Sequence, residues 1–155
     1  MGFLSRACTW AWLDLEPWSR GCEFAKAFNM KVTVISTSPS KKKEALEKLG
    51  ADAFLIRCYV YNDGIIDTVS GNHSVEPSLG LLKTSGKLIF VGAPPLPLEM
   101  SAQTLLMGRK MVGGSNIGGI EEMQEMVDFA ANHNVTAEVE VIAMEYVNCV
   151  REAPK

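Results

Sequence analysis

The alternation of apolar and polar positions divides the chain into short buried strands and amphipathic helices. Lys31–Ser36 is β-branched and almost wholly apolar, which is typical of a parallel strand buried on both faces. In the next segment, Ser40–Leu49, apolar residues recur at helical spacing. We expect Ser40 to be the N-cap of this helix and Gly50 to end it, because these residue types are favoured at those positions.

The same pattern continues along most of the chain. Because strands alternate with helices through short turns, the fold class is α/β, with a parallel sheet covered by helices on both faces. The apolar stripe of the last helix, which includes Ile120, Met123 and Val127, is expected to pack in the core. Strands are predicted over Ala53–Ile56, Gly64–Val69, Lys87–Gly92 and Glu138–Ile142, and helices over Val75–Lys83 and Ile120–Ala131.

One connection in this pattern is unusually short. Only Arg57–Asp63 separates the second predicted strand from the third, whereas parallel neighbours need a crossover of about a dozen residues. We therefore expect the parallel pairing to be disturbed in this region.

Composition places the chain among globular proteins and limits its partners. Of its 155 residues, 47% are hydrophobic and 21% are charged, and the net charge is -3. This balance argues against a general nucleic-acid binder, so any anion site must be local. No apolar run approaches the length that spans a membrane, and the apolar N-terminus is broken by Asp14, Glu16 and Pro17, which makes a poor signal peptide. The four scattered cysteines fit a reducing compartment, so we expect a cytoplasmic protein.

The first buried strand ends in hydroxyl groups where many nucleotide-binding strands end in a carboxylate. In a doubly wound fold, that carboxylate accepts the ribose hydroxyls of NAD, and small or basic residues in its place admit the extra phosphate of NADP. Here the position is Ser36, followed by Thr37, and Lys41 lies at the start of the next helix. Hydroxyls and a cation can hold a phosphate. The alternative is a solvated turn with surface lysines.

Three further strand ends carry residues that suit a dinucleotide. Ligands of parallel α/β sheets bind outside the carboxyl ends of the strands. Each signal is weak alone, but together they predict a cofactor along one sheet edge. His73 and His133 have no acid or cysteine at ligand spacing, so we interpret them as surface or packing residues. The three strand ends are Asp67–Val69, Gly92–Ala93 and the glycine-rich Gly113–Gly119.

Several segments resemble the NADP-binding domain of plant cinnamyl alcohol dehydrogenases and their mannitol dehydrogenase-like relatives, which are zinc-dependent medium-chain alcohol dehydrogenases. The resemblance runs from about Phe24 to Asn148, so residues 24–148 are expected to form a partial Rossmann-like domain, flanked by unrelated residues 1–23 and 149–155. The segments are KVTVISTSPSKKKEALEKLGAD, DGIIDTVS, LLKTSGKLIFVGAP, LLMGRKMVGGSNIGG and EEMQEMVDFAANHNVTAEVEVI.

The resemblance implies an oxidoreductase that interconverts aldehydes and alcohols with NADP and zinc. It also implies a homodimer, or association with relatives, through Arg109–Gly119. The cofactor-binding positions would be Ser36, Thr37 and Lys41 for the 2′-phosphate, Thr68 and Val69 for the adenosine and ribose, and Gly92, Ser115, Asn116 and Ile117 for the nicotinamide end.

The chain departs from this family in ways that bear on activity. The family's catalytic domain, with its zinc sites, lies upstream of the nucleotide domain, and we expect this chain to contain neither that domain nor zinc ligands. The family's G-x-G-x-x-G loop should precede FAKAF, but the chain reads TWAWLDLEPWSRGCEF. We therefore expect an incomplete Rossmann-like sheet with its first and last strands replaced or missing. Trp10–Trp18 would fill the central slot and leave a marginally stable domain with an exposed strand edge.

The genetic code suggests an origin for these departures. Read from the third base of its first codon, Trp10–Glu16 can encode Gly-Leu-Ala-Gly-Leu-Gly, and Cys149–Pro154 shifted by one base can encode Ala-Leu-Glu-Arg-Leu-Leu. We hypothesise that both ends are translated out of an ancestral frame; the alternative is an unrelated exon.

Two functions remain open from the sequence. The chain is either the coenzyme-binding part of an NADP-dependent dehydrogenase, inactive alone, or a non-catalytic, pseudogene-like fragment. Such a fragment would at most bind NADP weakly or associate with full-length relatives.

Overall fold

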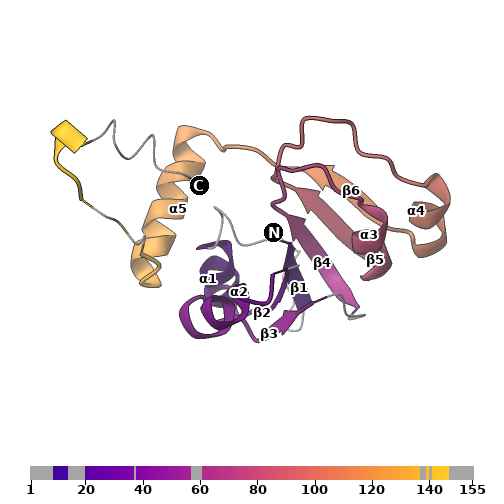
Figure 1. Cartoon of the computed structure of the whole chain (residues 1–155), viewed down its shortest axis with the longest axis horizontal. Coiled ribbons are helices and arrows are strands. Elements are labelled where there is room, and N and C mark those ends of the chain that lie inside the picture. Colours follow the sequence, from indigo (N-terminus) through magenta and orange to yellow (C-terminus); the bar gives the residue numbers. More distant parts are fainter. Residues whose placement is uncertain are drawn as a thin grey trace.

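The fold is built on six parallel strands in one sheet. The computed structural model describes residues 9–13, 20–36, 38–56, 61–136, 139 and 141–146. The strands lie in the order β3-β2-β1-β4-β5-β6, and every neighbouring pair is parallel (Figure 1). This is the order of a doubly wound dinucleotide-binding fold. The strands are β1 (Thr9–Leu13), β2 (Lys31–Ile35), β3 (Ala53–Leu55), β4 (Asn62–Asp67), β5 (Leu82–Phe90) and β6 (Met111–Gly114).

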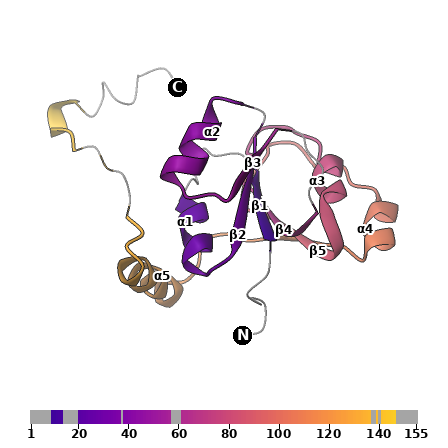
Figure 2. The same ribbon diagram turned by 90° about the horizontal axis from the view of Figure 1, so that it is seen from below.

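Helices cover both faces of the sheet, which confirms the predicted α/β architecture. Viewed along the sheet, α1 and α2 lie on one face and α3 and α4 on the other (Figure 2). The helical elements are α1 (Arg20–Ala27), α2 (Lys41–Lys43), the π-helical turn η1 (Glu44–Lys48), α3 (Glu76–Gly80), α4 (Ala102–Gly108), α5 (Ile120–Asn132) and the 3-10 turn η2 (Met144–Tyr146).

Strand β2 is buried on both faces, as its continuous apolar run predicts. Val32 and Val34 pack with Cys22 and Ala25 of α1 on one side. Ile35 belongs to a second cluster on the opposite face. The sheet therefore separates two apolar cores, and its middle strands have no solvated face.

Strand β1 fills the centre of the sheet. Thr9–Leu13 pairs with β2 on one side and β4 on the other, and Ala11 is completely buried. The strand is shorter than the predicted Trp10–Trp18, and residues 14–19 lie outside the described ranges. A replacement first strand is thus present in the slot that the sequence predicts.

The short connection before β4 does not disturb its pairing with β1. Ala53 pairs with Thr33, and Gly64 pairs with Trp10, both in parallel register. The expectation of disturbed pairing is wrong for these two pairs of strands, because β3 and β4 are not neighbours in the sheet. A register shift does occur on the other side of β4, against β5, between Asn62 and Gly64.

The elements after β5 differ most from the sequence prediction. Gly113 and Gly114 belong to β6 rather than to a loop, and α4 was not predicted. The predicted strand Glu138–Ile142 is wrong for its described residues, which are in no strand: Val139 and Val141 are 79% and 93% exposed. An isolated alternating segment cannot form a strand unless a partner satisfies its backbone groups.

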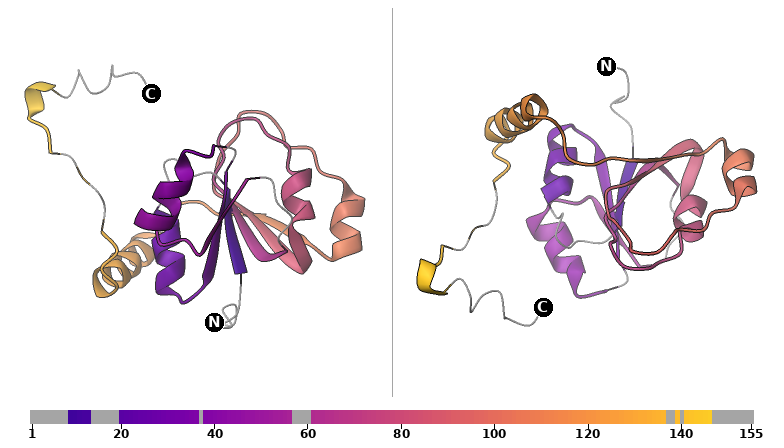
Figure 3. Two further views of the ribbon diagram at one scale, coloured as in Figure 1. Left: turned by 60° about the horizontal axis from the view of Figure 1, so that its bottom comes forward. Right: turned by 90° about the horizontal axis from the view of Figure 1, so that it is seen from above.

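Helix α5 lies beside α1, away from the sheet (Figure 3). Phe129 stacks on Phe28 with ring centroids 4.4 Å apart, and His133 stacks on Phe129 at 4.0 Å. The expectation that its apolar stripe packs in the core is wrong, since Ile120 is 90% exposed and Met123 is 55% exposed. The interpretation of His133 as a packing residue is confirmed.

Candidate functional site

Several of the predicted cofactor residues lie on one side of the sheet, at the carboxyl ends of its strands. Because all six strands are parallel, the residues that follow their carboxyl ends share one side of the molecule. Ser36 follows β2, Thr68 and Val69 follow β4, Gly92 lies just after β5, and Ser115 follows β6. The strand order reverses between β1 and β4, and ligands of this architecture bind at that point.

The ends of β4 and β5 are held in close contact through backbone groups. The Asp67 carbonyl oxygen accepts hydrogen bonds from the Val91 N–H at 2.9 Å and the Gly92 N–H at 3.0 Å. A Cβ atom on Gly92 would overlap the backbone of Thr68 and Val69. Glycine at position 92 therefore allows the two strand ends to form one continuous surface.

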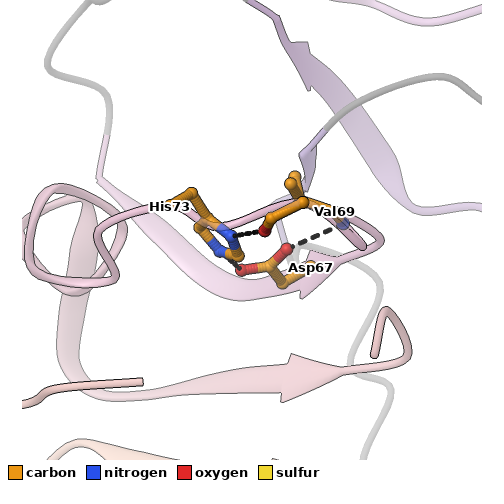
Figure 4. Close-up of polar contacts among 4 residues, drawn as sticks. Asp67, Val69 and His73 are labelled. Carbon is orange, nitrogen blue, oxygen red and sulfur yellow. Dashed lines mark hydrogen bonds and ion pairs between the residues drawn. The ribbon is translucent and has the colours of Figure 1, made fainter. Parts of the chain in front are cut away.

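A buried carboxylate organises the loop after β4. Asp67 is completely buried; its Oδ1 accepts the Val69 N–H at 3.0 Å, and its Oδ2 lies 2.8 Å from His73 Nε2 (Figure 4). His73 Nδ1 lies 2.9 Å from the Gly71 carbonyl oxygen. The interpretation of His73 as a surface or packing residue misses this acidic partner, because the turn after β4 returns the chain to the end of the strand.

The environment of His73 favours its charged form. Burial by itself would lower the imidazole pKa, but the hydrogen bond to the Gly71 carbonyl and the charge and hydrogen bond of Asp67 outweigh it. The net effect raises the pKa of His73 above its ordinary value of 6.5. Aspartate at a strand end, followed by a glycine turn and a histidine, is the signal in the sequence that could have revealed this pair.

The end of β2 carries a cluster of hydroxyl groups. Ser36 is buried, its N–H donates to the Leu55 carbonyl oxygen at 3.1 Å, and its Oγ accepts the Ser38 N–H at 3.2 Å. Ser38 Oγ and Ser40 Oγ are 2.7 Å apart. Ser40 is the N-cap residue of α2, as predicted, but its hydroxyl bonds to Ser38 and makes no side-chain capping hydrogen bond.

The other predicted residues are placed less closely together. Lys41 begins α2 and is half-buried, and Thr37 lies outside the described residues. Ser115 is anchored through its N–H to the Phe90 carbonyl oxygen at 2.9 Å, while Asn116 and Ile117 extend into solvent. The structure therefore brings Thr68, Val69 and Gly92 into contact with one another, whereas the residues after β6 lie at the outer end of the edge strand.

The opposite side of the sheet, at the amino ends of its strands, offers a poorer anion site. An open hollow of about 800 Å³ there is lined by residues that include Tyr61, Lys83 and Lys110. Both lysines are already engaged: Lys83 Nζ donates to Asp63 at 2.9 Å, and Lys110 Nζ donates to the Leu79 carbonyl oxygen at 2.5 Å. A phosphate at this edge would have to displace those bonds.

The part of the chain that the structure describes does not fit a zinc ion. No cluster of three His, Cys, Asp or Glu side chains in that part could hold a metal. Burial, together with the nearby charge of Glu23, raises the pKa of the Cys22 thiol to about 12. This thiol is therefore protonated and inert near neutral pH.

Comparison with known proteins identifies the family. A family model described as zinc-binding dehydrogenase matches residues 20–132. The chain belongs to the zinc-binding dehydrogenases. Mannitol dehydrogenase of Petroselinum crispum is 59% identical over 138 residues, covering 84% of this chain and 41% of that protein. A probable cinnamyl alcohol dehydrogenase of Arabidopsis thaliana is 52% identical over 136 residues, covering 83% of this chain and 38% of that protein.

Solved structures of dehydrogenases share the fold. A cinnamyl alcohol dehydrogenase of Sorghum bicolor superposes with a TM-score of 0.86 at 45% identity, covering 94% of this chain and 44% of its own. The CAD of Helicobacter pylori, complexed with NADP(H), gives a TM-score of 0.82 at 30% identity and covers 92% and 43%. The chain thus spans about two fifths of the length of the curated relatives it matches. None of the helices among the described residues has the length and apolarity that crossing a bilayer requires.

Proposed function

We propose that this chain is the coenzyme-binding unit of an NADP-dependent dehydrogenase of the cinnamyl alcohol or mannitol dehydrogenase type, and that it binds NADP along the carboxyl edge of its sheet. One observation carries the proposal. Ser36, Thr68–Val69 and Gly92 lie at the carboxyl ends of β2, β4 and β5, on both sides of the central strand of a 3-2-1-4-5-6 sheet. The NADP(H) bound to the relative from Helicobacter pylori supports the same cofactor.

The end of β2 is assigned to the 2′-phosphate. Ser36, Thr37 and Lys41 would bind it, because hydroxyl groups and a cation complement a phosphate, whereas a carboxylate at this position would repel it. The hydroxyl cluster with Ser38 supports the assignment, since it places hydrogen-bonding groups beside Ser36.

The rest of the edge is assigned to the remaining parts of the cofactor. Thr68 and Val69 would face the adenosine and ribose. Gly92 would lie at the nicotinamide end, where its missing side chain leaves room for the ring. The residues that complete this end would be Ser115, Asn116 and Ile117.

The affinity is expected to be weak. Residues 14–19, between β1 and α1, read DLEPWS and contain two carboxylates and no glycine. In a dinucleotide-binding fold, a glycine-rich turn at this point approaches the pyrophosphate. Carboxylates there would repel the cofactor.

We infer that the chain by itself does not turn over alcohol or aldehyde. The described residues do not fit the zinc ion that polarises the substrate in this family. An assay of cinnamaldehyde reduction with NADPH and added zinc should give no turnover, and robust turnover would contradict the inference. An inactive, pseudogene-like fragment remains the second candidate, distinguished by whether NADP binds at all.

The cofactor assignment is tested by calorimetric titration with NADP and NAD. Wild type should prefer NADP, Ser36→Asp should lose that preference, and Lys41→Met should weaken NADP binding roughly fivefold without changing NAD binding. Lys42→Met is the matched control, because this lysine is adjacent in sequence and is assigned no phosphate contact. An equal effect of both lysine variants, or no preference in wild type, would contradict the assignment.

We also propose that the chain associates through Arg109–Gly119, with itself or with longer relatives. β6 lies at an edge of the sheet, and Met111 is 52% exposed there. An open edge is a template for strand pairing. Analytical ultracentrifugation should detect a dimer that Met111→Lys weakens and that Met107→Lys, on α4, leaves unchanged; a wild-type monomer at high concentration would contradict this proposal.

A further inference from the structure

The loop after β4 contains a histidine whose two ring nitrogens both face oxygen acceptors. Nε2 lies 2.8 Å from the Asp67 carboxylate, and Nδ1 lies 2.9 Å from the Gly71 carbonyl oxygen (Figure 4). A neutral imidazole has one N–H and one lone pair, so only one of these contacts can then be a hydrogen bond. An imidazolium donates to both. The observed geometry is therefore satisfied completely only when His73 is protonated.

The same contacts connect His73 to the proposed cofactor surface. The Asp67 carboxylate is fully buried and also accepts the Val69 N–H, while the Asp67 carbonyl oxygen accepts the N–H groups of Val91 and Gly92. His73 therefore contacts Asp67 directly, and Asp67 is the residue that fixes the ends of both β4 and β5. Losing one His73 proton would leave either the Gly71 carbonyl oxygen or the buried Asp67 carboxylate without its donor.

We propose that His73 is a positioning residue for the NADP site, and that its protonation closes the loop of residues 67–73 in the conformation that binds the adenosine side of the cofactor. This inference rests on the proposed function for its ligand, but its structural part stands on the Asp67–His73–Gly71 contacts alone. His73 acts through Asp67 and Val69 and is assigned no contact with the reacting atoms.

Two acidic residues, Asp67 and Glu76, are the charged groups to consider near His73. Asp67 is the charged group that contacts its ring in the described part of the chain, and His73 itself is 19% exposed. Glu76, at the start of α3, is engaged elsewhere: its carboxylate accepts the Ser101 N–H at 2.7 Å and the Thr104 hydroxyl at 3.0 Å. The raised pKa of His73 agrees with the two oxygen acceptors that face its ring.

The structural part can be tested without any cofactor. The chain has two histidines, so ¹⁵N spectra of the imidazole rings resolve both titrations, with His133→Gln identifying the second signal. We expect His73 to carry protons on both nitrogens below its midpoint, and that midpoint to lie above 6.5. A single protonated nitrogen across the whole range, or a midpoint below the ordinary value, would overturn the proposal.

The functional part is tested by NADP affinity against pH in wild type and His73→Gln. Glutamine can donate hydrogen bonds through its amide but does not titrate. The phosphate of NADP titrates at about pH 6 in both proteins. The ratio of the two NADP affinities at each pH therefore isolates the contribution of His73. From pH 6.0 to 8.5 we expect wild type to lose about fivefold more affinity than the variant; His133→Gln should follow wild type.

The outcomes separate the two proposals. Parallel pH profiles of wild type and His73→Gln would show that His73 is structural only and would overturn its positioning role. Absence of NADP binding at every pH, with the ¹⁵N titration as expected, would instead refute the proposed function while leaving the proton-dependent loop in place. An NADP-linked upward shift of the His73 midpoint would support both.

Discussion

At the scale of single residues, the candidate site consists mainly of backbone geometry that small or buried side chains make possible. Gly92 lets the end of β5 lie against the backbone of Thr68 and Val69, and Asp67 fixes that contact from below the surface. Gly92, Thr68 and Val69 contribute shape and hydrogen bonds rather than charge. Their contribution can therefore be measured as stability even before any cofactor is added.

Adding one methyl group at Gly92 should be costly. Gly92→Ala would force Cβ into the backbone of Thr68 and Val69, and overpacking of this kind costs about 1–3 kcal/mol. Urea unfolding should show this loss of stability. Gly71→Ala is the control, because a Cβ there meets no atom within 4 Å. Equal stability of the two variants would contradict the close approach of β4 and β5.

Asp52 should make stability depend on pH in the acidic range. Partial burial acts to raise its pKa, but hydrogen bonds from Lys26 and the Val32 N–H and the charges of Lys26 and Lys31 outweigh this and lower it. The stabilisation is therefore complete above the unfolded pKa of about 3.9 and is lost as pH falls through the folded value.

The variant Asp52→Asn tests this contribution. Asp52 is 43% exposed, so after allowance for solvent screening we expect a loss of only about 1 kcal/mol at pH 7. The difference from wild type should shrink as pH falls below the folded pKa. Glu47→Gln, at an exposed ion pair of 4.0 Å, should have little effect at any pH. A pH-independent loss in Asp52→Asn would mean that its charge contributes nothing.

Residue-level prediction from the sequence succeeds for the position of a residue at the end of a strand. The strand-end positions of Ser36, Thr68 and Gly92 follow from periodicity alone, and the structure places them at one edge. The partner of His73 could not be predicted from ligand spacing, because a turn rather than a helix or strand determines where that ring lies. The same holds for Ser40, whose hydroxyl bonds to a neighbouring serine in the preceding turn.

At the scale of elements, the central strand is the least expected feature. β1 precedes residues 20–132, which the family model matches, yet it pairs with both β2 and β4. Its Trp10 side chain lies over Gly64, where a Cβ would come within 2.6 Å of the indole ring. A large residue in β1 is thus accommodated because its neighbour in β4 has no side chain.

A double-mutant cycle tests this arrangement. Gly64→Ala should destabilise wild type, because the new methyl group meets the Trp10 ring. In a Trp10→Val background the same change should cost less, with a coupling of about 1 kcal/mol. Urea unfolding of the four proteins gives the coupling directly. Zero coupling would mean that Trp10 does not occupy the central slot, and that another segment pairs with β4.

Elements with continuous apolar runs or clear helical spacing were predictable, and elements that depend on distant partners were not. Lys31–Ser36, Ala53–Ile56 and the helix Ile120–Ala131 correspond closely to β2, β3 and α5. β6 was read as a loop because two of its four residues are glycine, and its backbone pairing with β5 is what makes it a strand. Glu138–Ile142 shows the converse, since its alternating pattern lacks a pairing partner in the described residues.

At the scale of the whole molecule, the chain combines a six-stranded sheet of the dinucleotide-binding type with a C-terminal part that extends away from it. The sheet and its two cores explain the high similarity to dehydrogenase structures. The chain spans about two fifths of its curated relatives, so the activity of a complete enzyme is a proposal here and cofactor binding is the central claim. Apolar side chains on α5 and beyond it, among them Ile120 and Val141, are exposed.

The most direct test of the cofactor site is backbone amide NMR of the ¹⁵N-labelled chain titrated with NADP. We predict that the largest shift changes occur at Ser36, Val69, Gly92 and Ser115, along the carboxyl edge. Tyr61 and Thr84, at the amino edge, should remain unchanged, and NAD at the same concentration should produce smaller changes at Ser36. Absence of changes at saturating NADP, or changes confined to the amino edge, would contradict the account.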